Sequence, residues 1–168
     1  MSITSKDSLR NISDHEQKAL AVLSQQHFAI SPRIQGDFGF DTLVLGLAQR
    51  DSQALDRGLR ATTTAVSLDD SDPVLRFNLA AALLANGQMP QALASYEKAR
   101  DLVTAGKADL IGGAITDLNI VQQYCRGVRP ESYCHDLDSK VPTLKADLAA
   151  AAWPPVPAQI TRQSQTSI

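Results

Sequence analysis

Two cysteines and a histidine are the residues of this chain whose type and spacing could do chemistry. Cys125, Cys134 and His135 lie within the polar stretch YCRGVRPESYCHDLD. Thiolate and imidazole groups both bind zinc, and a zinc site here would need Asp136 or Asp138 to complete a set of four ligands. The same two cysteines could instead form a disulfide or remain free thiols, so the stretch has three interpretations.

The sequence favours free thiols. Cys125 and Cys134 are nine positions apart, a spacing that matches no standard zinc signature. A disulfide closing so short a loop would stabilise the fold by about 2–3 kcal/mol. However, the polar N-terminal sequence MSITSKDSLRNISDHEQ lacks the apolar stretch of a secretory signal, which predicts a cytoplasmic protein with reduced cysteines. A metal- or redox-dependent protein acting through Cys125, Cys134 and His135 stays as an alternative.

Other chemical signatures are weak. Gly112-Gly113 follows no strand and lacks the Lys-Ser/Thr of a phosphate-binding loop, and no paired carboxylates or catalytic triad has supporting context. Lys and Arg total 16 against 18 Asp and Glu, which argues against the basic footprint of a nucleic-acid-binding protein. No apolar run approaches the ~20 residues that cross a bilayer. We therefore predict a non-enzymatic protein with no cofactor, no nucleic-acid partner and no membrane insertion.

The elements that would position these residues are helices. Aromatic residues make up 5% of the 168 residues, alanine is plentiful, and no stretch alternates as a strand would. The sequence predicts an all-α domain over 13–152, between a flexible lead-in over 1–12 and a Pro-rich, polar, disordered tail over 153–168. Its helices are expected over 13–30, 41–50, 52–68, 72–86, 90–103, 107–125 and 142–152, with a connector over 34–40 and a loop over 128–140.

The segment NLAAALLANGQMPQALASYEKA, residues 78–99, carries a distinctive pattern. It has a large-small pair and a further leucine in one helix, a glycine at the turn, and a small-large-small triplet in the next helix: Leu79, Ala80, Leu83, Gly87, Ala92, Tyr96 and Ala99. This pattern closely resembles a tetratricopeptide repeat. In such a repeat, small residues let two helices cross and large residues fill the space beside them.

Neighbouring segments match this family less well at its period of about 34 residues. One period earlier, Leu45-Gly46 takes the large-small pair, while Thr62 replaces the aromatic residue. One period later, Gly113-Ala114 takes the pair, but Asp117 stands where a large apolar residue belongs. The resemblance is strong over 72–102, moderate over 39–70 and weak after 107. It implies antiparallel helix pairs stacked as a short right-handed superhelix.

The resemblance also implies a concave surface that holds a partner peptide. On this register the inner face is mainly apolar and comprises Phe40, Leu43, Leu47, Arg50, Val74, Phe77, Asn78, Ala81 and Leu84. An exposed apolar face of this kind predicts a protein–protein interaction module, an adaptor or a chaperone-like protein. Two alternatives stay open: the N-terminal helix or the tail covers this face, or the chain is a scaffold that assembles into homo-oligomers.

Overall fold

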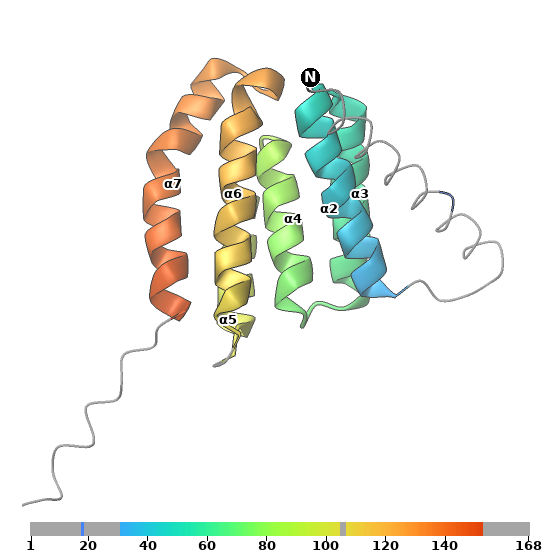
Figure 1. Cartoon of the computed structure of the whole chain (residues 1–168), viewed down its shortest axis with the longest axis vertical. Helices are drawn as coiled ribbons and strands as arrows, with labels where there is room; N and C mark the ends of the chain where they lie inside the picture. Colours follow the sequence, from blue (N-terminus) through green and yellow to red (C-terminus); the bar gives the residue numbers. More distant parts are fainter. Residues whose placement is uncertain (1–17, 19–30, 105–106, 153–168) are drawn as a thin grey trace, which may run out of the picture.

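The computed structural model describes residues 18, 31–104 and 107–152 of the chain. Within these ranges the fold is all-helical (Figure 1), which confirms the predicted class. The helices are α2 (Pro32–Gln49), α3 (Ser52–Leu68), α4 (Pro73–Ala85), α5 (Met89–Leu102), α6 (Asp109–Val128) and α7 (Glu131–Ala152). The expected lead-in over 1–12 and tail over 153–168 lie outside the described residues, as does the expected helix over 13–30 apart from Lys18. None of the helices described is long and apolar enough to span a membrane.

Local signals in the sequence set several helix ends. The Asp51 side chain accepts hydrogen bonds from the backbone N–H groups of Gln53 and Ala54 at the start of α3. Asp72 accepts one from Val74 at the start of α4, where Pro73 occupies a position that needs no N–H donor. Gly87 has a φ of 79° directly after α4, the left-handed conformation that glycine adopts without strain.

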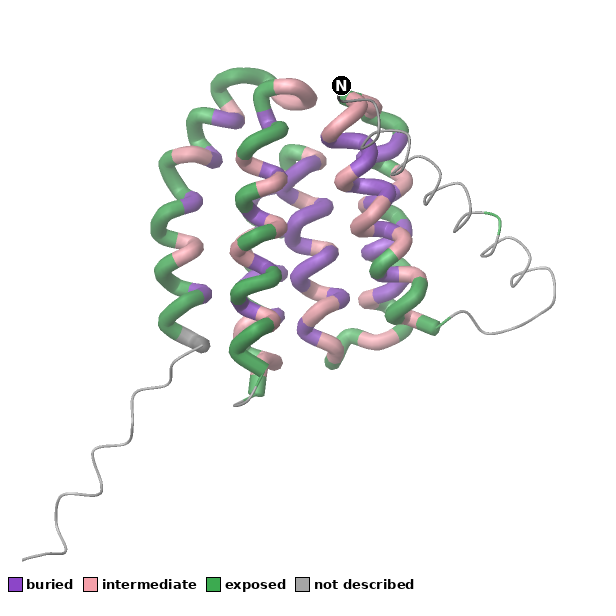
Figure 2. The backbone as a smooth tube through the Cα atoms, viewed as in Figure 1, coloured by how far each residue is buried: buried purple, intermediate pink, exposed green. Residues whose placement is uncertain are grey.

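Consecutive helices pack as pairs, with α4 at the centre of the molecule. The pairs are α2 with α3, α4 with α5, and α6 with α7, and α4 also contacts α2, α3 and α6. Buried positions are dense along α4 (Figure 2). Apart from Asn78, the segment FNLAAALLA is apolar on all sides, and a helix of that composition is stable only when other helices surround it. The core of the protein therefore forms around this helix.

The predicted connector over 34–40 is wrong, because these residues belong to α2. Its glycines reflect close helix packing instead of a loop. A Cβ added at Gly39 would lie 2.8 Å from the backbone nitrogen of Thr62, and one added at Gly46 would lie 2.9 Å from that of Leu55. Only glycine permits such close approach of α2 to α3.

The predicted loop over 128–140 is also wrong, because α7 begins at Glu131 and continues through Pro142. Buried apolar side chains recur along this helix at intervals of three, four and seven residues: Cys134, Leu137, Val141 and Leu148. That spacing places them on one helix face. Burial of this face against the rest of the bundle outweighs the hydrogen bond that a proline inside a helix removes.

Candidate functional site

The predicted concave surface is part of the core in this structure. Its members are buried at Leu43, Leu47, Phe77, Asn78, Ala81 and Leu84, half-buried at Phe40 and Val74, and exposed at Arg50. The helices α2 and α6 contact each other as well as α4, and they cover this side of α4. The amide of Asn78 donates a hydrogen bond to the Gly36 carbonyl of α2 at 3.3 Å. The six buried side chains therefore do not line an open groove in this structure, whereas Phe40, Val74 and Arg50 keep surface exposure.

The cysteines form a disulfide between α6 and α7, so the prediction of free thiols is also wrong. Cys125 and Cys134 are 2% and 0% exposed, with Cα atoms 5.7 Å apart. Bonded sulfurs cannot act as thiolate ligands or nucleophiles, so in this form the two cysteines do not make a metal site with His135. A redox role for the pair stays a prediction. His135 is exposed on α7, and no cluster of three metal-binding side chains occurs within 31–104 and 107–152.

Two hydrogen bonds join the region around the disulfide to the end of α4. The Tyr133 hydroxyl donates a hydrogen bond to the Leu84 carbonyl at 2.7 Å, and Arg129 donates one to the Ala85 carbonyl at 2.6 Å. Both acceptors lie in the last turn of α4, where carbonyl groups lack partners within the helix. Burial raises the pKa of Tyr133 to about 12, which keeps its hydroxyl a donor. The disulfide and these two bonds hold α7 at a fixed position beside α5 and α6.

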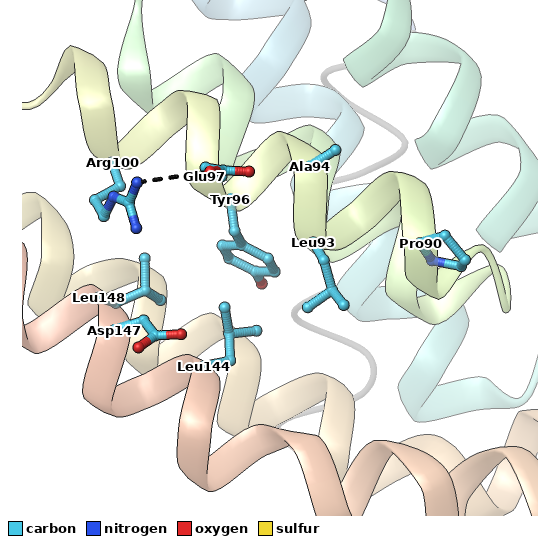
Figure 3. Close-up of a pocket in the computed structure, with 9 residues that line it drawn as sticks. All are labelled: Pro90, Leu93, Ala94, Tyr96, Glu97, Arg100, Leu144, Asp147 and Leu148. Atoms are coloured by element: carbon cyan, nitrogen blue, oxygen red, sulfur yellow. Dashed lines mark ion pairs between the residues drawn. The ribbon is translucent and has the colours of Figure 1, made fainter.

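A groove between α5 and α7 presents apolar side chains from two helices at an open surface of the described part of the chain. It has a volume of about 470 Å³ and is lined by Pro90, Leu93, Ala94, Tyr96, Glu97, Arg100, Leu144, Asp147 and Leu148. Figure 3 shows the side chains of Leu93, Tyr96, Leu144 and Leu148 in the space between the two helices. The two helices contact each other. Leu144 and Leu148 reach it only because α7 is a single long helix held against the bundle.

The floor of the groove is apolar. Leu93 and Leu144 are half-buried, while Leu148 and Tyr96 are each 1% exposed. The Tyr96 hydroxyl has no hydrogen-bond partner among the described residues. Burial raises the pKa of this phenol, and the negative charge of Asp117 adds to the rise, so Tyr96 remains neutral. Tyr96 is therefore a packing residue, as its position in the repeat pattern predicts.

The rim of the groove carries more negative than positive charge. Arg100 donates to Asp101 at 2.8 Å and lies 3.9 Å from Glu97, a pair marked in Figure 3. The hydrogen bond with Asp101, with smaller contributions from Glu97 and Asp147, raises the pKa of Arg100. Two carboxylates of the lining, Glu97 and Asp147, and the neighbouring Asp101 thus lie near one guanidinium group. The groove combines an apolar floor with an acidic rim, and these groups can bind a ligand but provide no activated nucleophile.

A half-buried carboxylate behind this groove makes stability depend on pH. Burial raises the pKa of Asp117 from 3.8 to about 6, so the folded state holds this proton more tightly than the unfolded state. The stabilisation is complete below about pH 4 and is lost as the pH rises through about 6. We expect Asp117→Asn to raise the free energy of unfolding at pH 7.5 by about 1 kcal/mol, a value discounted for partial solvent exposure.

Thermal unfolding of the wild type and of Asp117→Asn, each at pH 5.0 and 7.5, measures this effect. The variant's advantage in melting temperature should be larger at the higher pH, because only the wild type must carry a buried charge there. An advantage that is the same at both pH values would show that Asp117 has an ordinary pKa.

The sequence contains a helical pattern that could have predicted the α7 side of this groove, but the predicted loop over 128–140 interrupted it. The spacing of Cys134, Leu137, Val141 and Leu148 is helical, and it extends one continuous face from the disulfide to the groove. Comparison with protein-family models, with curated proteins and with solved structures finds no match to this chain. The function is therefore inferred from the fold and from the groove between α5 and α7.

Proposed function

We propose that this chain is a non-enzymatic protein–protein interaction module, built on tetratricopeptide-like helix pairs, that binds a partner through the groove between α5 and α7. The observation that carries the proposal is the groove itself, which brings leucine side chains from two helices to an open surface. Apolar side chains at an open groove favour the binding of apolar groups of a partner. The resemblance over 72–102 supports a module of this class.

The proposal assigns partner binding to the groove between α5 and α7 instead of the face of α4 that the repeat register predicts. The face of α4 that the repeat register assigns to a partner is occupied by α2 and α6. The groove lies on the second helices of two successive pairs, where Ala94 and Pro90 are exposed beside the half-buried Leu93 and Leu144. A partner can reach these side chains without separating the helix pairs.

Selection from a display library of random peptides on the full chain tests this proposal. We expect the selected peptides to lose at least tenfold in affinity for Ala94→Trp, because an indole at this exposed position fills the groove. Leu144→Glu should weaken the same peptides by placing a charge on the apolar floor. Fluorescence anisotropy measures the affinities, and circular dichroism verifies that each variant is folded.

The matched control is Gln123→Trp, which adds the same indole at an exposed position of α6 away from the groove. It should leave every affinity unchanged. If selected peptides bind Ala94→Trp and Leu144→Glu as tightly as the wild type, the groove is not the binding surface and the proposal fails.

A further inference from the structure

We infer that the occupant of the groove between α5 and α7 is an amphipathic helix that carries a lysine or arginine beside its apolar stripe. The inference rests on the proposed function and specifies the chemistry of the partner. Two properties of the groove support it, which are the helical character of its walls and the charge of its rim.

The walls of the groove favour a helix over an extended peptide. The backbone N–H and C=O groups of α5 and α7 are bonded within their own helices over this region, so the groove offers no strand edge to an extended chain. Grooves for polyproline segments are lined by aromatic rings, whereas the one aromatic residue here, Tyr96, is 1% exposed. The leucine side chains of two neighbouring helices instead form ridges that a third helix can fit between.

The dimensions fit a short helix. Pro90 and Arg100 mark the two ends of the groove on α5, and ten residues of helix span about 15 Å. A partner helix of about three turns covers that length. Apolar residues at its positions i, i+4 and i+7 would lie along the half-buried Leu93 and Leu144, in the manner of a helix bound in an apolar groove.

The charge of the rim specifies the polar side of this helix. The side chains of Glu97 and Asp101 are 68% and 63% exposed, and Asp147 is exposed across the groove. Arg100 is the single cation among the residues that line the groove. The lining itself holds two carboxylates, Glu97 and Asp147, against this one guanidinium group, and Arg100 is already hydrogen-bonded to Asp101 beside the groove. A lysine or arginine of the partner therefore gains attraction to Glu97 and Asp147. Such exposed pairs are individually weak, and salt screens them.

Two designed peptides test the inference on the full chain. Both are alanine-rich helices of about 18 residues, above the ~12–15 residues below which isolated helices are marginal in water, with leucines at i, i+4, i+7 and i+11. One carries two lysines beside the leucine stripe, and its matched control carries two glutamates at the same positions. Fluorescence anisotropy measures binding to the wild type, to Ala94→Trp and to the double variant Glu97→Gln/Asp147→Asn.

The inference predicts that the lysine peptide binds the wild type about fivefold more tightly than the glutamate peptide. The preference should disappear in the Glu97→Gln/Asp147→Asn variant and shrink at high salt, and Ala94→Trp should abolish binding of both peptides. Equal binding, or tighter binding of the glutamate peptide, with sensitivity to Ala94→Trp would overturn the charge assignment while retaining the groove.

Other outcomes separate this inference from the proposed function. Absence of binding by either peptide overturns the helical occupant, whereas the library selection still decides whether the groove binds peptides. A selected consensus that resembles residues 153–160 of this chain would identify its own tail as the occupant and would also overturn the inference. Peptide binding that ignores Ala94→Trp would contradict the inference and the proposed function together.

Discussion

Replacing Gly58 with alanine should lower the free energy of unfolding by about 2 kcal/mol. A Cβ at this position in α3 would lie 2.8 Å from the Gly39 carbonyl oxygen and 3.0 Å from the Leu43 backbone nitrogen. Both atoms belong to the backbone of α2, so a side-chain rotation cannot relieve the overlap. Alanine also gains about 1 kcal/mol of helix propensity over glycine, and the expected loss is what remains after this gain. Urea unfolding followed by circular dichroism measures it.

Gly112→Ala is the matched control because it makes the same substitution in another helix. Nothing lies within 4 Å of a Cβ added at Gly112, and the residue is exposed on α6. This variant should therefore gain up to about 1 kcal/mol from helix propensity alone. If Gly58→Ala is as stable as the wild type or more stable, α2 and α3 do not cross as closely as the structure shows.

Removing the disulfide should cost about 2–3 kcal/mol, since it closes a short loop between α6 and α7. We expect the double variant Cys125→Ala/Cys134→Ala to unfold at a lower temperature than the wild type while keeping its helices. Groove binding should weaken with it, because the disulfide helps to hold the helix that carries Leu144 and Leu148. Thermal unfolding and the peptide affinities measure the two effects.

Dithiothreitol provides the control for this prediction. It should lower the melting temperature of the wild type toward that of the double variant and leave the double variant unchanged. Titration of thiols in the unfolded, unreduced wild type should detect none. Two reactive thiols in that titration would restore the prediction of free cysteines made from the sequence.

The parts of the fold that the sequence predicts well are those with local signals. The expected helix starts at 52 and 72 and the turn glycine Gly87 agree with the start of α3, the start of α4 and the end of α4 within a residue or two. The helical class is confirmed for the same reason, because alanine-rich segments with such caps favour helices regardless of their partners. Packing within the repeat-like segment also agrees, since Ala92, Tyr96 and Ala99 are buried.

The features that the sequence does not predict depend on tertiary contacts. Gly36 and Gly39 are typical of a connector, but here they lie within α2 because α3 and α4 pack directly against them. Pro142 is typical of a helix start, but the buried residues before and after it lie on one face of a single helix. The face of α4 looked like an open groove because a helix pattern records which side chains are apolar, whereas the arrangement of α2 and α6 decides whether they are covered.

The pairing of the two cysteines also depends on tertiary structure and could not be predicted from the sequence. A separation of nine residues allows a disulfide only if a tight turn brings two helices side by side, and residues 129 and 130 between α6 and α7 make that turn. A buried disulfide favours an oxidising compartment, opposite to the cytoplasmic location expected from the N-terminal sequence. The location stays a prediction, and the thiol titration above bears on it directly.

The central claim is that the surface open to a partner is the groove between α5 and α7 and not the face of α4. The most direct measurement compares maleimide labelling of Ala94→Cys with that of Ala81→Cys, with and without a peptide selected on the full chain. The native cysteines are bonded and do not compete for the reagent. We predict that Ala94→Cys reacts rapidly and is protected by the peptide, while Ala81→Cys reacts only on unfolding. Rapid labelling of Ala81→Cys, with protection by the peptide there instead, would contradict the account.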